Sequence, residues 1–200
     1  SGSGQTGSLM PGAGGPPGGM PAKADTAWIK TKYLDVAYAS KSSAETLDLY
    51  LPNEGKGPFP LIIEIHGGGF IMGGKSGEIS PMLDGLKRGY AVASIGYRLS
   101  GEACFPAAIQ DVKAAIRFLR ANAAKYNLDP GKFATWGGSA GGNLSALAAV
   151  SNGAASLSDP SLGNPGVSEA VQAAVDWFGP IDFSTMDAEF KALGTSGIMG

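Results

Sequence analysis

The sequence has few of the residues that bind metals or form disulfides. Its 200 residues include a single cysteine, Cys104, and a single histidine, His66. One cysteine cannot form an internal disulfide or a cysteine-based zinc site, and one histidine cannot form a histidine-rich metal site. We therefore expect no metal site.

The sequence also lacks a strong charge of either sign and any long apolar run. Its formal net charge is −2, so nothing indicates nucleic acid or an anionic membrane surface as a partner. No stretch approaches the roughly 20 apolar residues that a membrane helix needs, and the N-terminus lacks the pattern of a signal peptide. We expect a soluble protein. Because the chain starts at Ser1 rather than Met, a cytoplasmic location and secretion with the signal already removed both stay open.

Composition divides the chain into a tail and one domain. Residues 1–24 are dominated by Gly, Pro, Ser, Ala and Met, too few of them large and apolar to offset the entropy lost on ordering. We expect a flexible Gly/Pro-rich tail there. The apolar content of 44% suits a single domain with a sizeable core over residues 25–200.

Strand and helix patterns alternate through this domain. A mixed aromatic and β-branched stretch and a period-two stretch predict two antiparallel strands, and the apolar run 61–65 predicts a central strand covered on both faces. Alternating strands and helices are typical of an α/β fold with a mainly parallel sheet and helices on both faces. The expected strands are 28–39, 46–51, 61–65, 90–95, 132–136 and 170–178, and the expected helices are 80–88, 106–126 and 139–150.

The helix expected over 106–126 has the clearest periodicity. Apolar residues recur in it at spacings of three and four. Its charged residues then fall on the face turned away from the core, and they are Asp111, Lys113, Arg117 and Arg120.

A nucleophile motif lies between an expected strand and an expected helix. Residues 137–141 read G-G-S-A-G and match G-x-S-x-G, in which the serine occupies a strained turn. Gly137 and Gly141 leave room for neighbouring backbone to approach. The start of the following helix offers free N–H groups and a partial positive charge to a developing anion. Ser139 is therefore the candidate nucleophile.

A second glycine motif follows the central strand. Residues 66–70 read H-G-G-G-F, and in lipases and esterases an H-G-G-G loop at this point supplies an N–H to the oxyanion, joined by the residue after the nucleophile. The candidate donors are Gly68, Gly69 and Ala140, because a side chain at the loop positions would keep the backbone from the oxyanion.

His66 is a tempting but poor candidate for the catalytic base. In α/β-hydrolases the base follows the nucleophile in the chain, whereas His66 precedes it. We expect His66 to orient the glycine loop.

Together these motifs resemble the hormone-sensitive-lipase-like esterases and the neighbouring bacterial feruloyl and acetyl-xylan esterases of the BD-FAE type. Hormone-sensitive-lipase-like members usually have an acidic residue just before the nucleophile, where this chain has Gly138, so the feruloyl or carbohydrate esterase group is closer. The resemblance rests on residues 47–52, 66–70, 97–99, 105–108 with Asp111, 136–143 and 176–180.

The resemblance implies an α/β-hydrolase fold of which this chain is the N-terminal portion. Family members place an acid about 80 to 100 residues after the nucleophile and a histidine about 30 later, and Gly200 precedes both positions. Asp176 and Asp182 follow Ser139 but belong to the strand after the nucleophile helix, so we do not expect either to be the acid. The C-terminal strands, the acid and the base would then come from a second polypeptide or a missing C-terminal segment. The resemblance also pairs Arg98 with Asp111 as a brace for the loop region.

The function expected is hydrolysis of small acyl, aryl or carbohydrate carboxylic esters through an acyl-enzyme, as in a carboxylesterase-type serine hydrolase that needs no cofactor. Two alternatives stay open. One is a non-catalytic protein that binds a ligand on the same fold. The other is an amide or peptide hydrolase, because the same triad serves those bonds.

Overall fold

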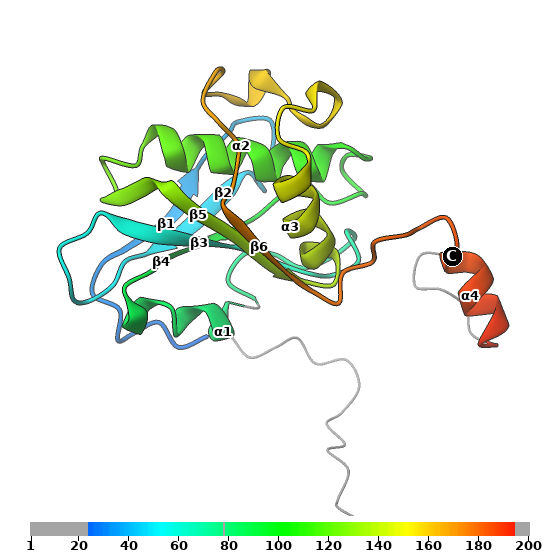
Figure 1. Cartoon of the computed structure of the whole chain (residues 1–200), viewed down its shortest axis with the longest axis horizontal. Coiled ribbons are helices and arrows are strands. Elements are labelled where there is room, and N and C mark those ends of the chain that lie inside the picture. The colour runs from blue at the N-terminus through cyan, green and yellow to red at the C-terminus, as the bar shows by residue number, and fades with distance from the viewer. Residues whose placement is uncertain (1–23, 78, 195–200) are drawn as a thin grey trace, which may run out of the picture.

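A six-stranded sheet forms the centre of the computed structural model, which describes residues 24–77 and 79–194 (Figure 1). The strand order is β1-β2-β4-β3-β5-β6. The first two pairings are antiparallel and the remaining three are parallel. The strands are β1 (Lys32–Ala37), β2 (Thr46–Tyr50), β3 (Phe59–Ile65), β4 (Ala91–Ile95), β5 (Leu128–Gly138) and β6 (Ala173–Trp177).

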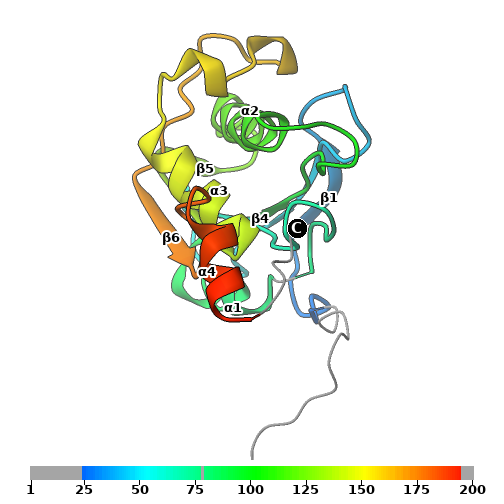
Figure 2. The ribbon, with the colours of Figure 1, turned by 90° about the vertical axis from the view of Figure 1, so that its right-hand side faces the viewer.

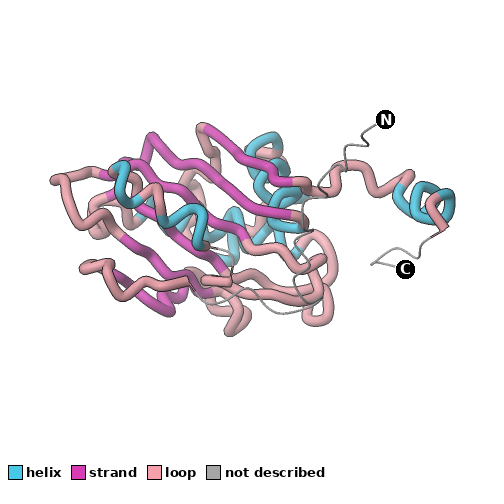
Figure 3. The backbone as a smooth tube through the Cα atoms, turned by 90° about the horizontal axis from the view of Figure 1, so that it is seen from below, coloured by secondary structure: helices cyan, strands magenta, loops and turns pink. Residues whose placement is uncertain are grey.

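Helices cover both faces of this sheet, as the sequence predicted. Helices α2 (Ala107–Ala121) and α3 (Ala140–Val150) lie on one face and α1 (Ser80–Leu83) on the other, as Figures 1 and 3 show. Helix α4 (Met186–Ala192) stands beyond the carboxyl end of β6, and Figure 2 shows the molecule from that side. Short 3₁₀ turns occupy Leu86–Arg88, Ala155–Leu157 and Pro160–Leu162. The described helices are too short or too polar to cross a membrane.

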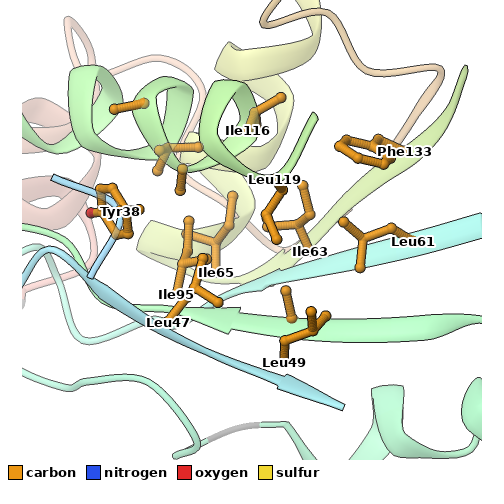
Figure 4. Close-up of a cluster of buried hydrophobic side chains, with 14 of the residues drawn as sticks. Tyr38, Leu47, Leu49, Leu61, Ile63, Ile65, Ile95, Ile116, Leu119 and Phe133 are labelled. Atoms are coloured by element: carbon orange, nitrogen blue, oxygen red, sulfur yellow. The ribbon is translucent and has the colours of Figure 1, made fainter. Parts of the chain in front are cut away.

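The two faces of the sheet carry separate apolar clusters because side chains alternate along each strand. Ile63 and Ile65 of β3 point toward Ile116 and Leu119 of α2 (Figure 4). Ile62, one position along, packs on the opposite face in the cluster that includes Met82 and Leu83 of α1. This two-sided burial confirms that residues 61–65 are a central strand.

Two of the predicted helices are shorter than their patterns suggested. The expected helix 80–88 stops at Leu83 and resumes only as a 3₁₀ turn. The Gly85 and Arg88 N–H groups donate to the carbonyls three residues earlier, those of Met82 and Gly85, and glycine is a poor helix former. The expected helix 106–126 ends at Ala121. Asn122 follows it, and its amide Nδ2 donates to the Phe118 carbonyl at 2.8 Å.

The structure tests little of what was expected at the two ends of the chain. Residues 1–23 of the expected tail and the segment 195–200 lie outside the described residues. Helix α4 was not expected at all. Asp187 and Glu189 lie in its first turn and Lys191 in its last, an arrangement of charges that is favourable for the helix dipole. The helix is too short to leave a recognisable apolar periodicity in the sequence.

The expectation that the charged residues of α2 face solvent was wrong for three of the four. Asp111, Lys113 and Arg117 are buried, and only Arg120 keeps partial exposure. The segment after α3 folds over this face and brings Glu169 to 2.9 Å from both Lys113 Nζ and Arg117 Nη1. The charges are therefore paired inside the protein, which the periodicity of one helix cannot reveal.

Replacing Glu169 with glutamine is expected to lower the free energy of unfolding by about 2–3 kcal/mol near pH 7, because two buried cations lose their counter-charge. Burial raises the pKa of the Glu169 carboxyl, but hydrogen bonds from Lys113 and Ser158 outweigh it and the pKa lies below its ordinary value. Such a group adds stability above its unfolded pKa and loses it as pH falls through the folded pKa. The difference between Glu169 and the variant should therefore shrink between about pH 7 and about pH 3.

Urea unfolding at both pH values measures this difference. Asp84, which forms an exposed ion pair with Lys87 at 2.9 Å, provides the control, and D84N should leave the urea midpoint unchanged. Equal midpoint shifts in E169Q and D84N would contradict the assignment.

Candidate active site

Ser139 lies on a strained turn between β5 and α3. Its φ is 53° and its ψ −122°, a region that residues with a side chain rarely adopt. A Cβ at Gly141 would lie 2.0 Å from the Ile65 carbonyl oxygen, and one at Gly137 would lie 2.6 Å from the same atom. Both positions must therefore be glycine for α3 and β5 to pack against β3 and hold the turn.

The glycine loop after β3 turns sharply beside Ser139. Gly68 has a φ of 112°, and its carbonyl oxygen accepts hydrogen bonds from the Ile71 and Met72 N–H groups, each at 3.1 Å. Gly69 and Phe70 also have positive φ values, 61° and 64°. This run of left-handed residues requires glycine at most positions, as the motif implied.

A pocket of about 220 Å³ brings Ser139, Gly69 and Ala140 together. These are the candidate nucleophile and two of the three candidate oxyanion donors. Gly68 is not among the lining residues, and its place is in the turn that shapes the loop. The rest of the lining is apolar and mostly aromatic, and it consists of Phe70, Phe178, Pro180, Phe183, Met186 and Phe190.

His66 is not among the residues that line this pocket. It is buried, its ring stacks on Tyr97 with centroids 4.2 Å apart, and its Nδ1 lies 2.7 Å from the Gly67 carbonyl oxygen. The Tyr97 hydroxyl donates to the His66 carbonyl at 2.9 Å. The ring lines a different pocket, of about 500 Å³. Among the described residues none donates to or accepts from the Ser139 hydroxyl, so no base is in place beside the nucleophile.

Arg98 and Asp111 form an ion pair beneath the glycine loop. Arg98 Nη2 donates to Asp111 Oδ1 at 2.6 Å and Arg98 Nε to Oδ2 at 2.9 Å. Hydrogen bonding to Asp111 raises the pKa of the Arg98 guanidinium above its ordinary value. Two residues later, the Ser100 N–H donates to the Phe70 carbonyl at 2.8 Å. The pair thus fixes the segment to which the glycine loop is hydrogen-bonded.

Polar contacts that hold the segment after the glycine loop, at Lys75 and Ser76, were not predicted from the sequence. The Ser76 N–H donates to Ser94 Oγ at 2.7 Å, and Ser94 Oγ in turn donates to the buried Glu64. Lys75 Nζ pairs with Asp48 Oδ1 at 2.7 Å. Burial raises the pKa of Asp48, but hydrogen bonds headed by that from Lys75 leave it below its ordinary value. The sequence did contain one indication of these contacts. Glu64 and Ser94 are polar residues inside otherwise apolar strands, and buried polar groups need hydrogen-bond partners.

The segment after β6 is fastened to the start of α3. The Ser139 N–H donates to the Trp177 carbonyl at 2.8 Å. Within the segment, the Gly179 N–H donates to Asp176 Oδ1 at 2.7 Å and closes a turn. Asn143 Nδ2 donates to the Pro180 carbonyl at 2.8 Å. Sequence reasoning noticed Asn143 only as part of a motif and gave it no role.

Asp176 and Asp182 each accept hydrogen bonds within a local turn. Asp176 closes the turn at Gly179. Asp182 accepts hydrogen bonds from the Ser184 N–H and hydroxyl, and these bonds lower the pKa of its carboxyl. Within residues 24–77 and 79–194, no three His, Cys, Asp or Glu side chains gather where they could hold a metal ion.

Known proteins with similar sequences and folds are esterases. "Probable carboxylic ester hydrolase LipM" of Mycobacterium tuberculosis is 36% identical over 158 residues, which cover 76% of this chain and 35% of that protein. "Esterase LipQ" of the same organism is 34% identical, with 76% and 36% covered. The chain thus spans about a third of the length of these curated relatives.

Solved structures with a similar fold include carbohydrate esterases. A structure described as a truncated form of a carbohydrate esterase from gut microbiota superposes with a TM-score of 0.72 and 42% identity, covering 83% of this chain and 61% of that one. A bifunctional GH43-CE protein of Bacteroides eggerthii gives 0.73 and 38%, covering 78% and 24%. The family model BD-FAE matches residues 47–197. This chain therefore belongs to the BD-FAE family and has the α/β-hydrolase fold.

Proposed function

We propose that this protein is a serine hydrolase that cleaves small acyl, aryl or carbohydrate carboxylic esters through an acyl-enzyme. One observation carries the proposal. Ser139 sits on a strained turn in the same pocket as Gly69 and Ala140, and this arrangement suits attack on a carbonyl whose oxygen develops charge. The relatives named as esterases support the bond type.

In the proposed mechanism the Ser139 hydroxyl attacks the ester carbonyl and loses its proton to a general base. The N–H groups of Gly69 and Ala140 donate to the oxygen of the tetrahedral intermediate, with Gly68 in the loop beside them. Removing one such donor typically costs about 10²–10³ in rate. The alcohol then leaves with the proton, and water releases the acid in a second, similar step.

The general base and its supporting acid come, in this proposal, from further polypeptide that pairs with β6. The only histidine of the chain is stacked on Tyr97 away from Ser139. Strand β6 pairs with β5 on one side, and four of its five residues are exposed, although parallel strands are normally covered. A further strand beside β6 would bring side chains to the same edge of the sheet as Ser139.

The 200-residue chain alone is expected to hydrolyse 4-nitrophenyl acetate barely above background, because a site without its base keeps only oxyanion stabilisation and binding. The assembled protein, in which further polypeptide supplies the base, is expected to turn over the same ester. Release of 4-nitrophenol measures both rates.

A serine-reactive fluorophosphonate provides the control for this comparison. It should label Ser139 in the assembled protein, and mass analysis of the labelled peptide would place the adduct. Full turnover by the isolated chain would contradict the missing base. An assembled protein that neither reacts with the probe nor turns over esters would favour the non-catalytic alternative.

A further inference from the structure

The wall of the Ser139 pocket comes mainly from one segment that has little support of its own. Residues 178–190 supply Phe178, Phe183, Met186 and Phe190 to the lining. Phe178 is 82% exposed and Phe183 47% exposed, so neither is held by burial in the core. The position of this aromatic wall depends on how its first residues are attached.

That attachment is a lock between β6 and the first turn of α3. Two hydrogen bonds cross between the segments, from the Ser139 N–H to the Trp177 carbonyl and from Asn143 Nδ2 to the Pro180 carbonyl. The bond from the Gly179 N–H to Asp176 shapes the turn between them. A Cβ at Gly179 would lie 2.4 Å from the Asn143 nitrogen, so the two segments are in tight contact. Of the two hydrogen bonds, the one from Asn143 to Pro180 lies nearer to Phe183 and the residues of α4 in the chain.

Asn143 also belongs to the turn that carries the nucleophile. Its N–H donates to the Ser139 carbonyl at 3.1 Å, and its side chain reaches Pro180 from the same turn. The residue therefore ties the aromatic wall to the backbone of Ser139 and fixes the distance between them.

We propose that Asn143 is a positioning residue that sets the preference of the site for acyl groups bearing a ring. The inference rests on the proposed esterase function. A ring-bearing acyl group fills the pocket and contacts the phenylalanines of the wall. An acetyl group reaches only Ser139 and the oxyanion donors, so its turnover does not depend on where the wall stands.

Asn143→Asp tests this in the assembled esterase. Aspartate has the shape of asparagine but no N–H donor, and its carboxylate repels the Pro180 carbonyl. The ratio of kcat/KM for 4-nitrophenyl benzoate to that for 4-nitrophenyl acetate should fall about threefold to tenfold, the range expected for one lost hydrogen bond. The change should lie in a higher KM for the benzoate, with kcat for the acetate unchanged.

Asn127→Asp is the matched control. Asn127 also donates through Nδ2 to a backbone carbonyl, that of Lys56, at 2.9 Å and far from the pocket, so its variant should keep the ratio. Asn143→Ala is the second variant, since it removes the same donor without placing a charge beside the Pro180 carbonyl. It should shift the ratio in the same direction as N143D.

The outcomes separate the two proposals. An unsubstituted assembled protein that hydrolyses neither ester overturns the proposed function and this inference with it. An active protein in which N143D and N143A both leave the ratio unchanged, or in which N143D lowers kcat/KM for both substrates equally, overturns the role of Asn143 alone.

Discussion

Replacing Ser139 with alanine is expected to lower kcat for 4-nitrophenyl acetate by about 10⁴–10⁶-fold in the assembled protein, since loss of the nucleophile removes the acyl-enzyme route. The backbone turn should survive, because alanine and serine have the same Cβ. The free energy of unfolding should therefore stay within about 1 kcal/mol of the unsubstituted protein. Initial rates and urea unfolding of the same preparation measure the two effects.

Ser145→Ala provides the control for this result. Ser145 lies in α3, the helix that follows Ser139. It is buried, and its side-chain oxygen has no hydrogen-bond partner among the described residues. Its removal should leave the rate unchanged. Turnover by the Ser139 variant at the unsubstituted rate would remove Ser139 from the mechanism.

Replacing Gly141 with alanine is expected to cost at least about 4 kcal/mol of folding free energy, which lies at the exceptional end of single substitutions. The new Cβ would sit 2.0 Å from the Ile65 carbonyl oxygen and 2.8 Å from that of His66. Both atoms are backbone, at the end of a central strand, and no side-chain rotation can relieve the overlap. The variant should be largely unfolded in conditions where the parent chain is folded.

Circular dichroism and urea unfolding of the 200-residue chain test this without any need for activity. Gly101→Ala is the matched control, because a Cβ there meets nothing within 4 Å and its backbone is not left-handed. That variant should unfold within about 0.5 kcal/mol of the parent. Equal stability of G141A and G101A would contradict the close packing of α3 on β3.

The features that were predicted well from the sequence are those that depend on residues close together in the chain. The turn at Ser139 needs glycines two positions to either side, and the loop at Gly68 and Gly69 needs adjacent left-handed residues, so each leaves a short pattern. The central strand 61–65 is likewise visible as a continuous apolar run.

The features that the sequence missed depend on contacts between distant segments. Lys113 is fully buried only because the chain after α3 returns across α2 and places Glu169 beside it. The bond from Asn143 to Pro180 spans 37 residues, and that from Ser76 to Ser94 spans 18. A helical or strand period reports which face a residue occupies, and carries no information about what later covers that face.

Strand β6 has a further consequence for handling this chain. On the side away from β5, the described residues place no strand next to the backbone N–H and C=O groups of β6. Its last residue, Trp177, is 40% exposed. Such an edge is a template for pairing with any extended segment, including the same strand of a second molecule. The five residues carry one charge, Asp176, to oppose that. We therefore expect the chain, prepared alone and at high concentration, to self-associate through this edge. In the proposed assembly, the polypeptide that pairs with β6 would cover the same edge and keep the protein monodisperse.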